Sequence, residues 1–130
     1  MVVDSSALMA ILRKEPEAER FAALIADSDG CTASALSLLE ASMVLAGNKG
    51  TDADFTRLDV LIAELDIEVV ALDARQAMVA RDAFLRYGKG RHKAALNMGD
   101  CASYALARSR SLPLLFKGND FTQTDLPAAA

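Results

Sequence analysis

Residues 33–46 read Ala33-Ser-Ala-Leu-Ser-Leu-Leu-Glu-Ala-Ser-Met-Val-Leu-Ala46, an apolar helical stretch with a single charge at Glu40. The charge is isolated over a still longer distance, because no other charged residue lies between Cys31 and Asn48. A lone carboxylate in so apolar a helix is costly to bury unless it is paired or binds a metal. Glu40 is therefore the first candidate for a functional residue.

A second helix, this one amphipathic, is predicted to follow the Glu40 helix. Its apolar side chains repeat at three- and four-residue intervals. They are Phe55, Leu58, Leu61, Ile62 and Leu65. We expect Ser34 or Ser37 to begin the first helix and Thr51 to cap the second. Two helices are thus predicted in succession, with no strand between them.

Short apolar runs predict four strands. They are Met1-Val-Val3, Cys31-Thr32, Ile67-Glu-Val-Val-Ala-Leu72 and Leu112-Pro-Leu-Leu-Phe116. We expect Ser5 or Ser6 to cap a helix after the first strand, and Asp73 to cap a long helix after the third. Another helix is expected from Asn97-Met-Gly-Asp100 to about Arg110. Strands that alternate with helices predict an α/β fold, a three-layer α/β/α sandwich with a short, mostly parallel sheet of about four strands.

The chain has 130 residues, of which 52% are hydrophobic and 25% charged, as in a globular domain with a sizeable core. We expect the domain to span residues 1–125, with residues 126–130 as a frayed tail. The net charge of −4 gives no overall basic field for nucleic acid, although bound cations would offset several of the acids.

Cys31 and Cys101 have no metal-binding spacing, so we expect two buried free thiols in a reducing compartment. No signal peptide precedes the first strand, and Glu40 interrupts the longest uncharged stretch. The sequence therefore predicts a cytoplasmic protein without a membrane span.

Four acids are expected to meet at one edge of the sheet. Asp4 closes the first strand and Asp120 follows the last, while Glu40 and Asp100 lie near the beginnings of helices. In an open parallel sheet, ligands bind beyond the carboxyl ends of the strands, where the crossover helices also begin. Mg²⁺ and Mn²⁺ prefer such oxygen ligands, and two such ions can assist the hydrolysis of a phosphodiester. The sequence therefore predicts a metal-dependent hydrolytic site.

Each acid also has a purely structural explanation. Asp100 could be an N-cap, Asp4 could accept backbone N–H bonds, and Asp120 could be a turn residue. Glu40 fits such an explanation least well. It is the common position of the four acids that favours a metal site.

The segments that carry these acids resemble those of PIN-domain ribonucleases, in particular the VapC toxins of bacterial type II toxin–antitoxin pairs. The similar segments are Met1-Val-Val-Asp-Ser-Ser-Ala7, Ser34-Ala-Leu-Ser-Leu-Leu-Glu40, Asn97-Met-Gly-Asp-Cys-Ala-Ser-Tyr-Ala105, and Leu112-Pro-Leu-Leu-Phe-Lys-Gly-Asn-Asp-Phe121 with Thr124-Asp125. Their order and spacing cover nearly the whole chain. The resemblance implies a Mg²⁺- or Mn²⁺-dependent endoribonuclease, a homodimer, and a VapB-like antitoxin that blocks the site.

The resemblance also implies roles for individual residues. The positions of the metal ligands are occupied by Asp4, Glu40 and Asp100. Ser6 resembles the small hydroxyl residue that supports the first aspartate. Many PIN domains have a Thr-Gly-Asp turn after the last strand, which would put Asn119 at the acidic position. Asp120 is the acid of that turn here, so we assign it the fourth catalytic role and give Asn119 a supporting one.

A basic loop before the Asp100 helix is a candidate for contact with RNA. It contains Lys89, Arg91, His92 and Lys93, which would suit RNA phosphates or equally form a solvated surface loop. His92 could serve as a general base, but hydrolysis by a metal-activated water does not require one. Lys117 could contact a phosphate or merely flank an exposed turn.

A phospho-receiver signalling domain is the alternative interpretation. It is also a small doubly wound domain, with an early aspartate, an acid in the position of Asp73 and a lysine in the position of Lys117. Receivers carry adjacent acids after the first strand, whereas Ser5-Ser6 follow Asp4 here. Their strict alternation of strand and helix also conflicts with the two successive helices, so the sequence favours the ribonuclease.

Overall fold

A computed structural model describes residues 1–47 and 55–130, and the predicted cap at Thr51 lies outside these residues. The described residues form a four-stranded sheet with the order β3-β2-β1-β4. Its strands are β1 (Val2–Val3), β2 (Cys31–Ser34), β3 (Ile67–Val70) and β4 (Leu114–Leu115). Every pair of neighbouring strands is parallel. The predicted sheet is therefore confirmed, although β1 and β4 are shorter than the apolar runs that predicted them.

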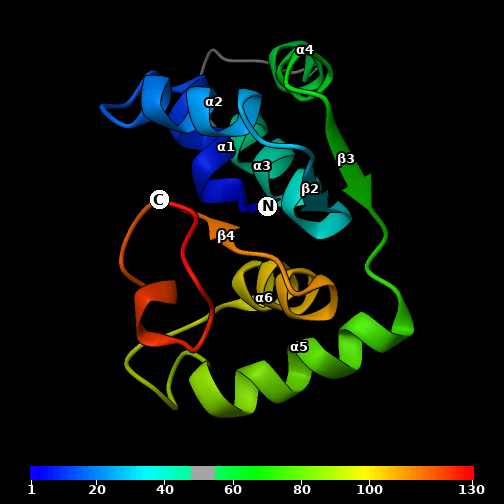
Figure 1. Cartoon of the computed structure of the whole chain (residues 1–130). Helices are drawn as coiled ribbons and strands as arrows, with labels where there is room; N and C mark the ends of the chain where they lie inside the picture. The colour runs from blue at the N-terminus through cyan, green and yellow to red at the C-terminus, as the bar shows by residue number, and fades with distance from the viewer. Residues whose placement is uncertain (48–54) are drawn as a thin grey trace.

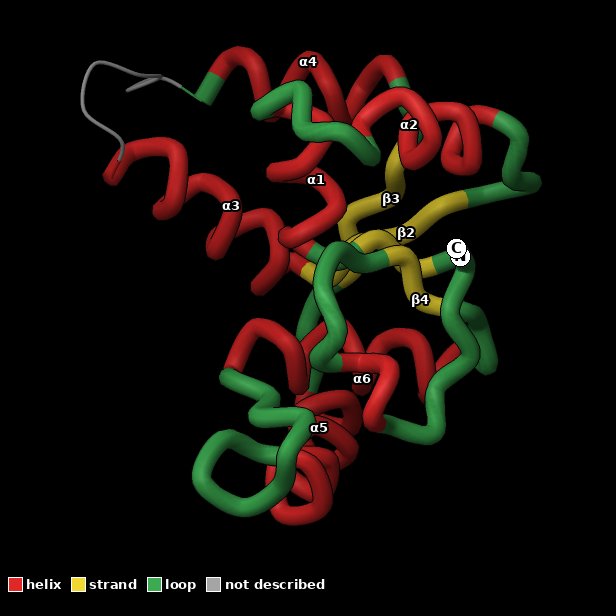
Figure 2. Tube along the Cα trace, turned by 90° about the vertical axis from the view of Figure 1, so that its left-hand side faces the viewer, coloured by secondary structure: helices red, strands yellow, loops and turns green. Residues whose placement is uncertain are grey.

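Helices cover both faces of this sheet (Figures 1 and 2). One layer contains α1 (Ser5–Leu12), α2 (Ala18–Ala26), α3 (Ala35–Gly47) and α4 (Thr56–Glu64). The other contains α5 (Ala74–Tyr87) and α6 (Met98–Arg110), next to a short 3₁₀ helix, η1 (Phe121–Gln123). This arrangement confirms the predicted α/β/α sandwich, and α3 and α4 are the two successive helices expected from the sequence.

The alternation of side chains along the strands divides the core in two. Val3 and Leu115 pack into the cluster under α1 to α4, whereas Val2 and Leu114 pack into the cluster under α5 and α6. All four side chains are fully buried. Because successive residues of a strand point to opposite faces, even two-residue strands connect both layers.

The predicted cap of α1 is wrong, and so is the interpretation of Asp100 as an N-cap. The N-cap of α1 is Asp4 rather than Ser5 or Ser6, and its carboxylate accepts the Ser6 N–H at 3.0 Å. The N-cap of α6 is Asn97, so Asp100 lies in the first turn of the helix instead of capping it. Aspartate and asparagine both accept such bonds well, and the sequence did not decide between adjacent candidates.

The sequence suggested that the carboxyl-terminal residues form a frayed tail, but in the structure they are hydrogen-bonded to the sheet. Leu114 N–H donates to the Pro127 carbonyl at 3.0 Å, and Ala129 N–H donates to the Leu114 carbonyl at 2.9 Å. The tail thus pairs with the open edge of β4. This pairing satisfies backbone groups that an exposed edge strand would leave free.

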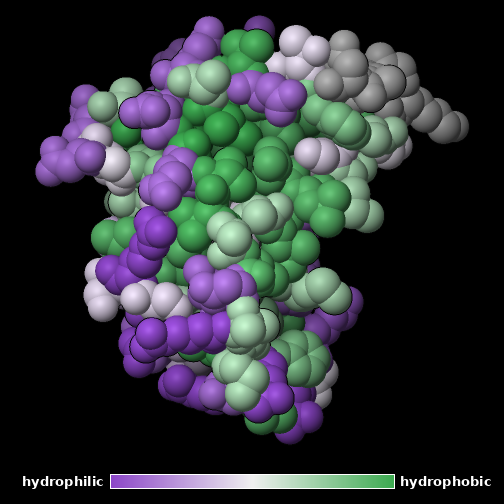
Figure 3. All heavy atoms as spheres, turned by 90° about the vertical axis from the view of Figure 1, so that its right-hand side faces the viewer, coloured by the Kyte–Doolittle hydropathy of each residue, from purple (hydrophilic) through white to green (hydrophobic). Residues whose placement is uncertain are grey.

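The surface on the side of β3 and the beginning of α5 is uneven in character (Figure 3). Hydrophobic side chains gather in the upper part of this view, and hydrophilic side chains dominate the lower part. Within the described ranges, no helix is long and apolar enough to cross a membrane.

Candidate metal centre

The centre of the sheet places Asp4 where the winding reverses. β1 pairs with β2 on one side and with β4 on the other, and Asp4 follows β1 directly. This is the position at which doubly wound sheets bind their ligands. The Asp4 side chain is only 2% exposed, so it is the deeply buried acid of the site.

Neighbouring donors hold the Asp4 carboxylate in place. Oδ1 accepts a hydrogen bond from Ser103 Oγ at 2.5 Å, and Oδ2 accepts the Ser6 N–H at 3.0 Å. Ser103 Oγ also lies 3.1 Å from Ser37 Oγ, and both of these serines are completely buried. Both of these donors are neutral, so neither supplies a positive charge to the Asp4 carboxylate.

The first turn of α6 presents Asp100 through a capping box. Asp100 Oδ2 accepts the Asn97 N–H at 3.0 Å, and Asn97 Oδ1 accepts the Asp100 N–H at 2.9 Å. The pKa of Asp100 is raised from 3.8 to about 7. Burial is the largest cause, the Asn97 N–H bond opposes it, and the charges of Asp4, Asp120 and Glu40 add to the rise. A cation would relieve this repulsion.

Glu40 reaches the same place from the second turn of α3. Its Oε1 accepts a hydrogen bond from Ser5 Oγ. A Cβ atom on Gly99 would lie 2.6 Å from Glu40 Cδ, so only glycine lets the carboxylate approach α6 this closely. Glu40 is half-buried and not fully buried, which corrects the expectation drawn from its apolar helix. The lone charge is tolerated because it faces a polar pocket.

Asp4, Glu40 and Asp100 line one pocket of about 420 Å³, which we call the acidic pocket. Arg13 and Lys117 are the cationic residues of its lining. Within residues 1–47 and 55–130, no three His, Cys, Asp or Glu side chains stand close enough together to hold one ion. The donor set nevertheless fits a hard divalent cation, because it consists of carboxylates whose mutual repulsion already raises the pKa of Asp100.

The turn after β4 contributes less directly. Asp120 and Asn119 are exposed and do not line the acidic pocket, although the charge of Asp120 acts on Asp100. Ser6 Oγ accepts the Lys117 N–H at 3.0 Å and so ties this turn to α1. The Lys117 ammonium is paired with Glu15 and lies 3.4 Å from Glu17. Its charge is therefore partly offset within the protein.

The basic loop lies outside the acidic pocket. Lys89, Arg91 and Lys93 are exposed, and none of the loop's four basic residues lines the pocket. His92 Nδ1 accepts the Ala94 N–H at 3.0 Å, and its ring packs edge-on against Tyr87 at 5.2 Å between centroids. In this conformation His92 organises the loop.

The sequence analysis assigned no role in the site to Ser103, Ser37 or Gly99. Serine in a helix is common, and the partner of Ser103 lies 99 positions away in the chain. Gly99 stands directly before Asp100 in the first turn of a helix, where glycine lowers helix stability. Its presence there was a sign in the sequence that the position has another role.

The chain matches the family described as PIN domain over residues 1–126. It is 48% identical over 128 residues to "Ribonuclease VapC" of Mycolicibacterium smegmatis, which covers 98% of each chain. It is 45% identical over 130 residues to "Ribonuclease VapC30" of Mycobacterium tuberculosis, covering 100% of this chain and 98% of that protein. The resemblance inferred from the sequence is thereby confirmed.

Solved structures of low sequence identity share the fold. VapC20 of Mycobacterium tuberculosis, described as a sarcin-ricin loop cleaving toxin, superposes with a TM-score of 0.73 at 19% identity over 96% of this chain and 95% of that chain. VapBC2 of Rickettsia felis, bound to a DNA fragment from its promoter, gives a TM-score of 0.75 at 12% identity over 98% and 94%. Nothing among these comparisons supports a phospho-receiver.

Proposed function

The chain belongs to the PIN-domain family, and on that basis we propose that its acidic pocket is the active site of a metal-dependent endoribonuclease, the toxin of a toxin–antitoxin pair. The observation that carries the proposal is the convergence of Asp4, Glu40 and Asp100 on one pocket at the switch point of the sheet. The cleaved bond is an RNA phosphodiester, as the names of the ribonuclease relatives suggest.

Asp4, Glu40 and Asp100 would hold Mg²⁺ or Mn²⁺, and their hydrogen bonds fix the orientation of each carboxylate. Ser103 and the Ser6 N–H position Asp4, the capping box positions Asp100, and Ser5 positions Glu40. Such supporting bonds orient metal ligands and raise metal affinity. The charge of Asp120 acts on Asp100, and we assign Asp120 the fourth catalytic position, with Asn119 and Ser6 in supporting roles.

When bound, the metal supplies an activated water and stabilises the charge that develops on the phosphodiester. Because water and not the ribose 2′-hydroxyl is the nucleophile, cleavage leaves a 5′-phosphate and a 3′-hydroxyl. Arg13 lines the pocket with an exposed guanidinium and is placed to contact a substrate phosphate. The basic loop holds RNA outside the pocket by charge alone.

We further propose a cytoplasmic homodimer that is inhibited by a VapB-like antitoxin. Leu39, Met43 and Met98 are 54%, 66% and 77% exposed and form an apolar face beside Glu40. Large exposed side chains of this kind mark interaction sites. We assign this face to the second copy of the chain, and the antitoxin to the acidic pocket itself.

RNA cleavage by the wild type, Asp4→Asn and Asp100→Asn tests the proposal. Both variants keep the shape of the side chain and remove its charge, so cleavage should fall by more than about 100-fold, and a cooperative melting transition would establish that each variant is folded. The matched control is Asp59→Asn, an exposed acid on α4. Undiminished cleavage in either pocket variant would contradict the assignment.

A further inference from the structure

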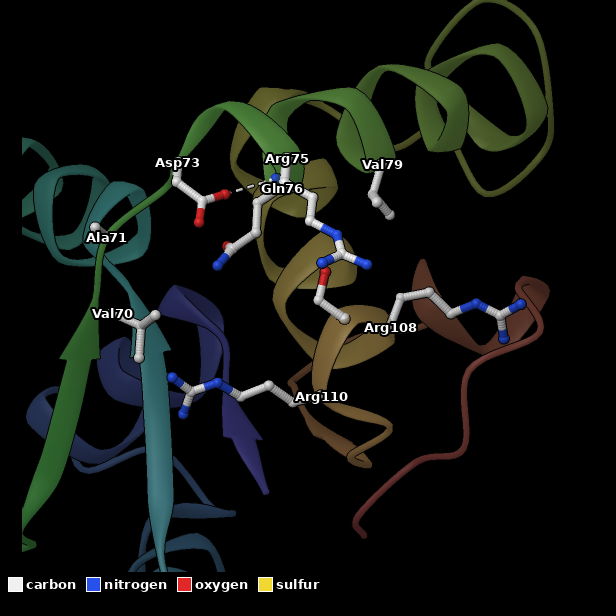
Figure 4. Close-up of a pocket in the computed structure, with 9 residues that line it drawn as sticks. Val70, Ala71, Asp73, Arg75, Gln76, Val79, Arg108 and Arg110 are labelled. Atoms are coloured by element: carbon white, nitrogen blue, oxygen red, sulfur yellow. Dashed lines mark hydrogen bonds between the residues drawn. The ribbon is translucent and has the colours of Figure 1, made fainter.

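A second hollow, of about 670 Å³, lies at the other end of α6 (Figure 4). Its walls are the end of β3, the beginning of α5 and the last turn of α6. Ten residues of helix separate Asp100 from Arg110, which corresponds to about 15 Å along the axis. The hollow is thus separate from the acidic pocket. We call it the arginine pocket, because Arg75, Arg108 and Arg110 line it.

Two of these guanidinium groups are available to a ligand. In residues 1–47 and 55–130, no hydrogen bond or ion pair engages the side chain of Arg75. Arg110 lies 3.6 Å from Glu68, but both side chains are substantially exposed, and such pairs are weak. Arg108 points away from the hollow and lies 3.5 Å from Asp125. Arg75 and Arg110 therefore remain as anion-binding groups.

Gln76 adds a polar group that lacks a partner. It is only 7% exposed, its amide points into the hollow, and its Oε1 accepts no hydrogen bond from the described residues. A buried acceptor without a donor costs free energy that a ligand carrying a donor would recover. The backbone N–H of Gln76 is already bonded to Asp73 Oδ1 at 2.8 Å, so the helix cap itself is occupied.

We propose that the arginine pocket binds a ribonucleotide. Arg75 and Arg110 take its phosphate, because guanidinium groups match the geometry of phosphate oxygens. Gln76 Oε1 accepts a hydrogen bond from a ribose hydroxyl or a base N–H, and its amide nitrogen is a donor for the same base edge. Val70 and Val79 supply apolar contact. Inorganic sulfate, which carries no proton at neutral pH, has nothing to donate and would leave Oε1 without a partner.

Binding of 5′-AMP to the full-length protein, followed by titration calorimetry, tests this site. We expect binding by the wild type and a loss of roughly ten-fold or more in affinity in the Arg75→Gln/Arg110→Gln double variant. Arg81→Gln, an exposed arginine on the same helix, is the matched control and should bind normally. Absence of AMP binding to the wild type, or equal binding by the double variant, would overturn the proposal.

Gln76→Met separates nucleotide recognition from simple attraction of an anion. It keeps the size of the side chain and removes the acceptor, so it should weaken AMP binding without changing the affinity for inorganic sulfate. Equal loss for both probes, or no loss for AMP, would contradict the role of Gln76. The melting temperature of each variant establishes that it is folded. None of these measurements depends on catalysis, so they stand whatever the acidic pocket does.

The nucleotide can be free or part of an RNA strand, and competition distinguishes the two sources. A single-stranded RNA oligonucleotide bound to the Asp100→Asn protein should displace AMP if the arginine pocket holds substrate RNA. AMP that stays bound at saturating RNA identifies the free nucleotide as the ligand. Either result supports the site, provided that the double variant abolishes the AMP signal.

Discussion

The two ends of α6 carry pockets of opposite charge that differ in how firmly their side chains are held. At the beginning of the helix, Asp4 and Asp100 each accept hydrogen bonds from neighbouring donors. At its end, the guanidinium of Arg75 has no partner among the described residues, and that of Arg110 has one exposed partner. The side chains of the acidic pocket are therefore held in place by the protein itself, whereas the guanidinium groups of Arg75 and Arg110 are held by few contacts within the described residues.

This difference has a physical cause. Carboxylates that crowd together repel one another, so each needs a donor that fixes its orientation in the absence of a cation. Exposed arginines keep their freedom because water solvates them at little cost. Changes at the acidic end should consequently have larger effects than equivalent changes elsewhere.

Among changes that leave the acidic side chains themselves in place, the largest effect is expected from Gly99→Ala. The new methyl group would occupy the space of the Glu40 carboxylate, which is the flexible end of a side chain and can move away. We expect RNA cleavage to fall by about 100-fold, because small displacements at a reacting centre have effects of that size. The melting temperature should change little, and Gly30→Ala, which has open space around its Cβ position, is the control. Normal cleavage by Gly99→Ala would show that the position of Glu40 does not matter.

Ser103→Ala should have the next largest effect. It removes the hydroxyl that positions Asp4 Oδ1, so affinity for Mn²⁺ should fall by about 10- to 100-fold. Ser42→Ala is the control, because Ser42 bonds only to the Leu38 carbonyl within its own helix. Calorimetric titration with Mn²⁺ provides the measurement. An unchanged affinity would assign Ser103 to packing alone.

The acidic end was largely predictable from the sequence, and the arginine end was not. Glu40 is conspicuous because its helix is otherwise uncharged, and Asp4 because it closes a strand. Arg75 and Arg110 look like ordinary surface residues in a chain with 14 lysines and arginines. Long-range partners such as Ser103 and Asp4 become visible only when the fold brings them together. The predicted cap of α5, Asp73, is confirmed. The caps of α1 and α6 were missed for a local reason, since several adjacent residues could accept the same N–H.

A smaller effect is expected on the way the stability of the metal-free protein changes with pH, because Asp100 is protonated more readily in the fold than in the unfolded chain. The pKa of this carboxyl rises from an ordinary value of 3.8 to about 7 in the fold, so between these values the native state binds more protons than the unfolded state. The metal-free protein should lose stability as the pH rises from about 4 to about 7. Asp100→Asn should lack this contribution while its amide oxygen still accepts the Asn97 N–H. Parallel melting profiles for the two proteins across this range would exclude the effect.

The smallest effect is expected at the basic loop. RNA binding weakens as salt rises, and its salt dependence is the slope of the logarithm of the binding constant against the logarithm of the salt concentration. Replacement of Lys89, Arg91 and Lys93 by Gln should make this slope less steep by about 0.7 for each phosphate that the loop no longer neutralises. Metal affinity and melting temperature should barely change, because the three side chains are exposed. RNA affinity across a salt series, with Asp100→Asn as the background, measures the slope. Identical slopes would return the loop to plain solvated surface.

We propose above all that Asp4, Glu40 and Asp100 are the residues that bind divalent metal in the acidic pocket. The most direct test is the shift in melting temperature on addition of Mn²⁺ to metal-free protein, for the wild type, Asp4→Asn, Glu40→Gln and Asp100→Asn. A ligand that binds only the native state raises its stability in proportion to the logarithm of ligand concentration over Kd. We predict a clear rise for the wild type, a smaller one for Glu40→Gln and almost none for the two aspartate variants. An equal rise in all four proteins would place the metal elsewhere and contradict the account.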